Sequence, residues 1–203
     1  MTTVVYTPAA SADDADQRGD AGAFSSTNTS LRAYAHTTAS SRYHVGVRFP
    51  GVAVPRGAIV LAAHFEPSTI AFDDPDVILY LHDHDDAPDF ADVADEDVLS
   101  RTRTTASTVW DATNVGSGYV PSPDISAAVQ EVVDRAGWAS GQAMALVVIS
   151  ATDTITQLLF WSYDWGIPPK MSVTYMVRLG RAFSIRKPHR QPPHPPRGRR
   201  MGR

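Results

Sequence analysis

The sequence contains no cysteine, which excludes a disulfide scaffold, cysteine-ligated metal sites and thiol catalysis. No apolar run approaches the roughly 18 residues that a membrane-spanning helix requires, so we expect no membrane partner. The first residues, Met-Thr-Thr-Val-Val-Tyr, lack both the basic and the apolar segments of a signal peptide, and we expect no export signal. What remains is a chain of 203 residues, 43% hydrophobic, long enough for one globular domain with its own core.

Recognised catalytic motifs are absent as well. The chain has no G-x-S-x-G elbow, no H-E-x-x-H motif, no phosphate-binding loop and no dinucleotide fingerprint. Carboxylates are abundant, but half of the 22 acidic residues lie between Asp73 and Asp97, a run typical of a solvated face. A glycosidase instead needs two carboxyl groups held across a cleft. The sequence therefore predicts a protein that is not an enzyme, with no catalytic residues.

The last 26 residues contain no acidic residue. They carry nine basic residues, so the net charge of −4 is the sum of +9 on residues 178–203 and −13 on residues 1–177. Five of the fifteen prolines also fall in this segment, and they favour extended backbone. We therefore expect two parts, a folded domain over residues 1–177 and an extended basic arm over residues 178–203.

Cations without counter-charges seek an anionic surface. Nucleic acid is one candidate, but the aromatic interleaving typical of single-strand binding is missing. The acidic surface of a neighbouring subunit is the other candidate, and two apolar residues in the arm favour such a protein groove. The predicted docking residues are Arg178, Arg181, Phe183, Ile185, Arg186, Lys187, Arg190, Arg197, Arg199, Arg200 and Arg203.

Short β-strands dominate the acidic part of the chain. Tyr43 to Phe49 alternates apolar and other residues, as a half-buried strand does, and Pro50 and Gly51 end it. Because no long helices separate the strands, the pattern favours an antiparallel two-sheet sandwich of the jelly-roll kind. The other expected strands are 58–66, 77–81, 104–110, 143–149, 157–163 and 171–177, with weaker candidates at 4–6 and 23–26.

One short helix is expected near residues 123–136. Ser122 or Asp124 can cap its N-terminus, and apolar residues from Ile125 to Val133 recur at spacings of three and four. Gly137 is well placed to end the helix in a left-handed conformation. Trp138 follows, and we expect it, like Trp110, to lie in the core or at a sandwich end.

The segment from Tyr119 to Gly141 (YVPSPDISAAVQEVVDRAGWASG) resembles a characteristic stretch of DNRLRE-type β-sandwich domains, which are related to the family 96 carbohydrate-binding modules. Other segments resemble that family in the same order, and together they span about residues 4–177. They are Ala10–Asp14, Val45–Phe49, Val54–Ala58, Arg101–Trp110 and Pro169–Tyr175.

The resemblance implies a β-sandwich and not a particular chemistry. Such domains occur in secreted glycan-active or cell-surface proteins and in virions of tailed phages. A lone domain without an export signal suits the phage setting. We therefore expect a virion structural protein that decorates the head, in many copies or as a homo-oligomer, with the major capsid protein or another virion subunit as its partner. A tail-associated role and a carbohydrate-binding role are the alternatives.

The run from His82 to Asp86 is the metal candidate. On extended backbone the side chains of His82 and His84 share one face, and those of Asp83 and Asp85 share the other. Imidazoles suit zinc and clustered carboxylates suit calcium. We favour the alternative of an acidic loop that holds no metal, because no third histidine is placed by the sequence. A calcium ion at Asp13, Asp14 and Asp16 has weaker support.

Three aromatic residues recur at every second position: Trp161, Tyr163 and Trp165. On one strand they would share a face on which sugar rings could stack. Core packing with one exposed edge aromatic is the alternative, and we favour it because aromatic residues are enriched in strands in general.

Overall fold

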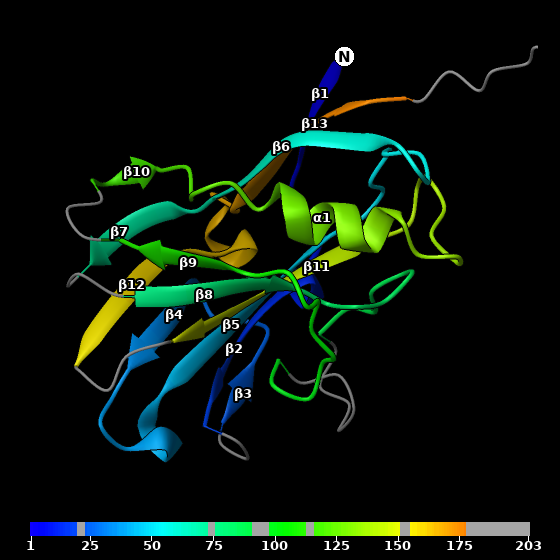
Figure 1. Cartoon of the computed structure of the whole chain (residues 1–203). Coiled ribbons are helices and arrows are strands. Elements are labelled where there is room, and N and C mark those ends of the chain that lie inside the picture. Colours follow the sequence, from blue (N-terminus) through cyan, green and yellow to red (C-terminus); the bar gives the residue numbers. More distant parts are fainter. Residues whose placement is uncertain (20–22, 73–75, 91–97, 113–115, 151–154, 178–203) are drawn as a thin grey trace, which may run out of the picture.

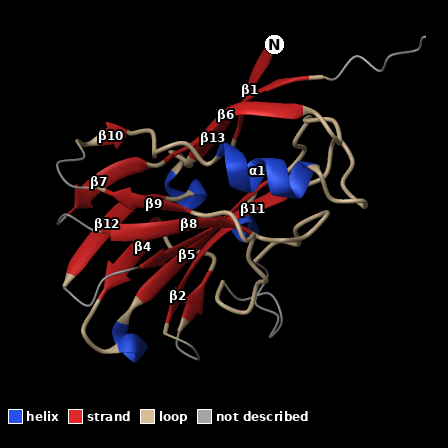
Figure 2. Ribbon diagram, in the orientation of Figure 1, coloured by secondary structure: helices blue, strands red, loops and turns tan. Residues whose placement is uncertain are grey.

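The computed structural model describes residues 1–19, 23–72, 76–90, 98–112, 116–150 and 155–177. It confirms an all-β, antiparallel fold with one short helix (Figures 1 and 2). The basic arm, residues 178–203, lies outside the described residues. The strands are β1 (Thr2–Tyr6), β2 (Asp14–Arg18), β3 (Phe24–Ser25), β4 (Ser30–Ala35), β5 (Tyr43–Phe49), β6 (Ile59–Glu66), β7 (Ser68–Phe72), β8 (Asp76–Leu81), β9 (Thr108–Asp111), β10 (Gly118–Tyr119), β11 (Met144–Ser150), β12 (Thr156–Trp161) and β13 (Lys170–Met176).

The strands form two antiparallel sheets. One has three strands in the order β1-β13-β6, and it lies at one end of the molecule, beside helix α1 (Ser126–Val133) (Figure 1). The other has ten strands, and its main path runs β10-β7-β12-β4-β5-β11-β8-β9, with β2 and β3 beside β5. Strands β4 and β5 pair only at Tyr34 and Tyr43, so the large sheet curls there and its two halves enclose a core.

The main core draws on both sheets. Its largest side chains include Phe49, Phe65, Phe160 and Leu79, all without solvent exposure. The rings of Phe65 and Phe160 meet edge to face, with centroids 5.7 Å apart, and so join the small sheet to the large one. Burial of this apolar surface is the main source of the free energy of folding.

Trp110 and Trp138 are both buried in the main core, as predicted. The Trp138 indole donates a 2.9 Å hydrogen bond from Nε1 to the Val54 carbonyl, so its polar atom is satisfied inside the protein. No helix in the described part of the chain has the length and apolarity to cross a membrane.

Helix α1 is shorter than predicted. It runs over eight residues, and the Asp124 carboxylate accepts a 2.9 Å hydrogen bond from the Ser126 amide at its start. The prediction that Gly137 ends the helix in a left-handed conformation is wrong: Gly137 is not among the residues with positive φ, and the helix ends at Val133. Gly137 packs closely on another segment: an added Cβ would lie 2.0 Å from an Asp85 carboxylate oxygen, so the Asp85 side chain would have to shift.

Several strand predictions need correction. The predicted strand 104–110 is replaced by the shorter β9, and the predicted strand 157–163 ends at Trp161. Four strands were not predicted: β2, β4, β7 and β10. Of these, β2 has the sequence Asp-Ala-Asp-Gln-Arg, whose first four residues are buried only because other segments cover them.

Candidate functional site

A polar strip lies on the outward face of two paired strands, β4 and β12. Along β4 the side chains alternate between buried and half-buried positions, with Leu31 and Ala33 in the core. The partner strand β12 does the same with Leu158 and Phe160. The antiparallel register therefore places three outward pairs side by side: Ser30 with Trp161, Arg32 with Leu159, and Tyr34 with Gln157.

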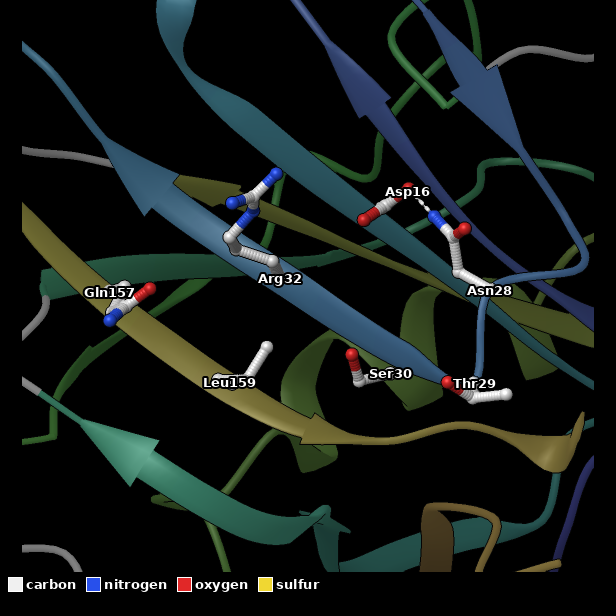
Figure 3. A pocket seen from close by; sticks show the side chains of 7 residues that line it. All are labelled: Asp16, Asn28, Thr29, Ser30, Arg32, Gln157 and Leu159. Atoms are coloured by element: carbon white, nitrogen blue, oxygen red, sulfur yellow. Dashed lines mark hydrogen bonds between the residues drawn. The ribbon is translucent and has the colours of Figure 1, made fainter. Parts of the chain in front are cut away.

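A cavity of about 380 Å³ opens in this strip (Figure 3). The Arg32 side chain points from β4 towards Asp16 of β2, and β12 lies on the other side of β4. The lining residues are Asp16, Asn28, Thr29, Ser30, Arg32, Gln157 and Leu159. They provide one carboxylate, one guanidinium, two amides, two hydroxyls and one aliphatic side chain. Such a mixture of donors and acceptors suits a neutral, hydroxyl-rich ligand.

The carboxylate and the guanidinium of the cavity are each held in place. Asp16 is buried and accepts a 2.8 Å hydrogen bond from the Asn28 amide. Burial raises the pKa of Asp16 to about 6, although the Asn28 bond and the positive charge of Arg32 oppose the rise. The guanidinium carbon of Arg32 lies 3.9 Å from the centre of the Tyr43 ring, a cation–π contact.

Two tryptophans stack beside the cavity. The rings of Trp161 and Trp165 are nearly parallel, with centroids 4.5 Å apart, and Trp165 is 52% exposed. Trp161 is paired with Ser30, which lines the cavity, so the aromatic pair continues the polar strip. An exposed indole is a suitable surface for a sugar ring.

The prediction that Trp161, Tyr163 and Trp165 alternate along one strand is wrong. β12 ends at Trp161, and Tyr163–Trp165 forms a 3-10 turn, η3. The buried Ser162 hydroxyl donates a 2.6 Å hydrogen bond to the Asn28 carbonyl, and this bond holds the chain where it leaves the strand. Trp161 and Trp165 thus meet through a turn.

The turn η3 is anchored by a second carboxylate of β2. Asp14 accepts a 2.8 Å hydrogen bond from the Tyr163 amide, and its side chain is fully buried. Its other oxygen, Oδ1, accepts no hydrogen bond from the part of the chain that the structure describes. Burial raises the pKa of Asp14 to about 7, and the nearby carboxylates of Asp164, Asp13 and Asp16 add to the rise. Alternation of hydrophobic residues gave no signal for β2, so sequence reasoning missed this anchor.

The predicted metal candidates lie in the segment after β8. Asp83 and Asp85 both accept hydrogen bonds from Arg135, which follows α1 in the chain; the bond from Nε to Asp85 Oδ1 is 2.6 Å long. His82 is buried and its ring stacks on that of His84, with centroids 5.1 Å apart. Burial lowers the pKa of His82 to about 4.

The fifth metal candidate, Asp86, accepts a 2.8 Å hydrogen bond from the Ala143 amide. Within the described ranges no group of three or more histidine, aspartate or glutamate side chains is arranged to hold a metal ion. Sequence reasoning considered the carboxylates of this segment as ligands, and it did not identify Arg135 as their partner. The eleven predicted docking residues of the arm lie outside the described residues.

No protein-family model matches the chain, and no curated protein matches it.

Proposed function

We propose that the chain is a non-enzymatic structural protein of a tailed-phage virion. In this proposal the β-sandwich decorates the head, and the basic arm docks on the acidic surface of the major capsid protein or of another virion subunit. The observation that carries the proposal is the charge separation, with nine basic and no acidic residues in the arm against a net −13 on the rest. The resemblance to DNRLRE-type domains, which occur in virions of tailed phages, is the reason for proposing a phage protein.

The cavity supports a binding role over catalysis. Its lining contains one carboxylate, Asp16, whereas hydrolysis of a glycosidic bond needs two carboxyl groups facing each other across the substrate. Asp16 accepts a hydrogen bond from Asn28, and Arg32 lies against the Tyr43 ring, so contacts within the protein hold both side chains in place.

Co-sedimentation with purified particles tests the docking proposal. Heads and tails that lack this protein are incubated with the full chain and with a variant that ends at Val177. We expect the full chain to sediment with heads and the shortened variant to remain in the supernatant. A matched variant with Phe183→Ser and Ile185→Ser keeps all nine cations and separates apolar anchoring from charge.

Each other outcome selects an alternative. Equal sedimentation of the full and shortened chains would show that the arm does not dock the protein. Sedimentation with tails alone would establish the tail-associated role. A shift of DNA by the full chain that disappears steeply with salt, and is lost in the shortened variant, would indicate a nucleic-acid partner.

Glycan binding is the second candidate, favoured by the stacked Trp161–Trp165 pair beside the polar cavity. Affinity electrophoresis through gels containing host cell-wall or capsular polysaccharide tests it. We expect the full chain to be retarded, and Trp165→Ala and Arg32→Ala to reduce the retardation by about ten-fold in affinity, the loss of one stacking or bidentate contact. Tyr80→Ala, on β8, is the matched aromatic control. Unretarded migration in every polysaccharide would exclude this function.

A further inference from the structure

The two edges of the three-stranded sheet β1-β13-β6 differ in how far the rest of the chain covers them. An edge strand exposes a row of N–H and C=O groups that can pair with another strand, and proteins usually block such edges. One edge here is β6 and the other is β1. The hydrogen-bond partners of the backbone groups on each edge show which edge is available for pairing with another strand.

The β6 edge is hydrogen-bonded at several positions by the segment that leads into and forms α1. The Gln130 side chain accepts from the Val60 amide at 2.8 Å and donates to the Ala58 carbonyl at 3.0 Å. The Asp124 carboxylate accepts from the Ala63 amide at 2.9 Å. The remaining bonds are Ile125 N–H to Ala63 O at 2.8 Å, Phe65 N–H to Ser122 Oγ at 3.0 Å and Ser122 N–H to Phe65 O at 2.7 Å.

The β1 edge has no such cover among the described residues. The backbone of Thr2–Tyr6 pairs with β13 from Tyr175 to Met171, and no described residue forms hydrogen bonds with the backbone of β1 on its other side. Val5 is 54% exposed, and β1 lies at the outer end of the molecule (Figure 1). The other outer strands of the described chain are shorter: β3 and β10 have two residues each, and β9 has four.

The sequence of β1 suits pairing with itself. Thr2–Tyr6 contains no charge, no proline and no glycine, so none of the usual features that discourage edge pairing is present. In an antiparallel pair centred on Val4, Thr3 of one copy lies opposite Val5 of the other. Both side chains are exposed, so they share the outward face.

Electrostatics also favours this face for contact between copies. Residues 1–177 carry a net charge of −13, so acidic surfaces of two copies repel each other. The outward positions of β1 and the neighbouring β13 residues Ser172 and Thr174 are neutral. Two copies can approach here without bringing like charges together.

We propose that β1 is a homodimerisation edge. Two copies pair their β1 strands antiparallel about a two-fold axis, which joins the two small sheets into one continuous six-stranded sheet. The inference does not depend on the virion proposal. Because a five-residue ladder is a small interface, the dimer exchanges with monomer as the protein is diluted.

Sedimentation velocity of the full chain over a wide concentration series tests this proposal. We expect a reversible monomer–dimer equilibrium. The double variant Thr3→Lys with Val5→Lys places lysines opposite lysines in both cross-strand pairs, and we expect it to weaken the dimer by about ten-fold or more. The double variant Thr3→Glu with Val5→Glu should do the same. Mixing the two variants should restore a dimer, now a heterodimer with opposite charges across the pair.

Val109→Lys is the matched control, because Val109 is 62% exposed on β9 in the other sheet. It should leave the equilibrium unchanged, and urea titration of each variant verifies that folding is retained. Three outcomes overturn the proposal: a full chain that stays monomeric at every concentration, a dimer that the lysine variant does not weaken, or a lysine–glutamate mixture that stays monomeric. A dimer that survives the β1 variants but is lost on removal of residues 178–203 would assign self-association to the arm.

Discussion

Two acidic segments of this protein look alike in the sequence and are stabilised in opposite ways. Strand β2 carries Asp14 and Asp16, and the segment after β8 carries Asp83 and Asp85. Asp14 and Asp16 are buried, and neither forms an ion pair with a described residue within hydrogen-bonding distance. Asp83 and Asp85 are more than one-third exposed and both bind Arg135.

The difference shows that the position of a carboxylate in the fold decides whether it is buried or lies beside a cation at the surface. Burial without a close cation raises the pKa values of Asp14 and Asp16, whereas the aspartates at Arg135 share one guanidinium. His82 is also buried, and in this residue burial lowers the pKa. The two segments should therefore give the protein opposing pH dependences.

The largest effect is expected from Asp14→Asn. Because the pKa of Asp14 is about 7 in the folded protein and 3.8 in an unfolded chain, the folded state binds the extra proton between these values. The bound proton stabilises the folded state at low pH by about 4 kcal/mol, and this stabilisation is lost as the pH rises to 7. Relative to wild type, the variant should therefore gain stability from pH 4 to pH 8. Urea unfolding at several pH values measures the gain.

Asp134→Asn, at an exposed position, is the control for this experiment and should show no comparable change. A difference in stability between Asp14→Asn and wild type that is the same at every pH reflects the buried amide that replaces Oδ1. Only the part of the difference that changes with pH reports the ionisation of Asp14. A difference between variant and wild type that stays constant from pH 4 to pH 8 would contradict the raised pKa.

His82→Phe should give the opposite slope. The pKa of His82 is about 4 in the folded protein and 6.5 in an unfolded chain, so its contribution to stability is present above pH 6.5 and is lost towards pH 4. The full difference corresponds to about 3 kcal/mol. The variant should gain stability over wild type as the pH falls through this range, measured by the same urea titrations. His84→Phe, on the exposed ring of the stack, is the matched control; an equal response from both variants would refute the assignment to His82.

Gly137→Ala tests the close packing beside Arg135. The new Cβ would lie 2.0 Å from an Asp85 oxygen, so the carboxylate must move away from the guanidinium. We expect a loss of at most about 1 kcal/mol in the free energy of unfolding, measured by thermal or urea denaturation, because the displaced carboxylate belongs to a partly exposed ion pair. In an Asp85→Ala background the same substitution should be nearly neutral. Additive costs in the double variant would show that Asp85 is not the group displaced.

Arg135→Gln should also have a small effect. The Arg135 side chain is 29% exposed and its two partners are more exposed, so water screens the ion pairs. We expect a loss of at most about 1 kcal/mol, and a smaller loss when salt is added. A loss as large as that expected at Asp14 would mean that the Arg135 contacts stabilise the fold far more than their exposure indicates.

Much of the fold could be predicted from hydrophobic periodicity. The strands at Tyr43–Phe49, Asp76–Leu81 and Met144–Ser150 have apolar residues that match their buried faces, and the helix was found from its spacing of three and four. Strand β2 could not be found this way. Its carboxylates and amide are buried by segments distant in sequence, a tertiary effect that local pattern does not encode.

The candidate site was predictable only in part. The aromatic residues Trp161 and Trp165 were identified from their spacing, but the turn that stacks them depends on Ser162 and on Asp14, which lies about 150 residues away in the sequence. Arg32, Asn28 and Gln157 carried no motif, and they line a cavity because β4 and β12 pair.

The sequence by itself determined the all-β class, the short helix and the separation of charge between residues 1–177 and 178–203, because periodicity and charge are properties of the local chain. The tertiary structure decided which carboxylates are buried, which cation neutralises Asp83 and Asp85, and which of two sheet edges is covered. These features depend on contacts between residues far apart in sequence, and burial and distance set both the pKa values and the free hydrogen-bonding groups.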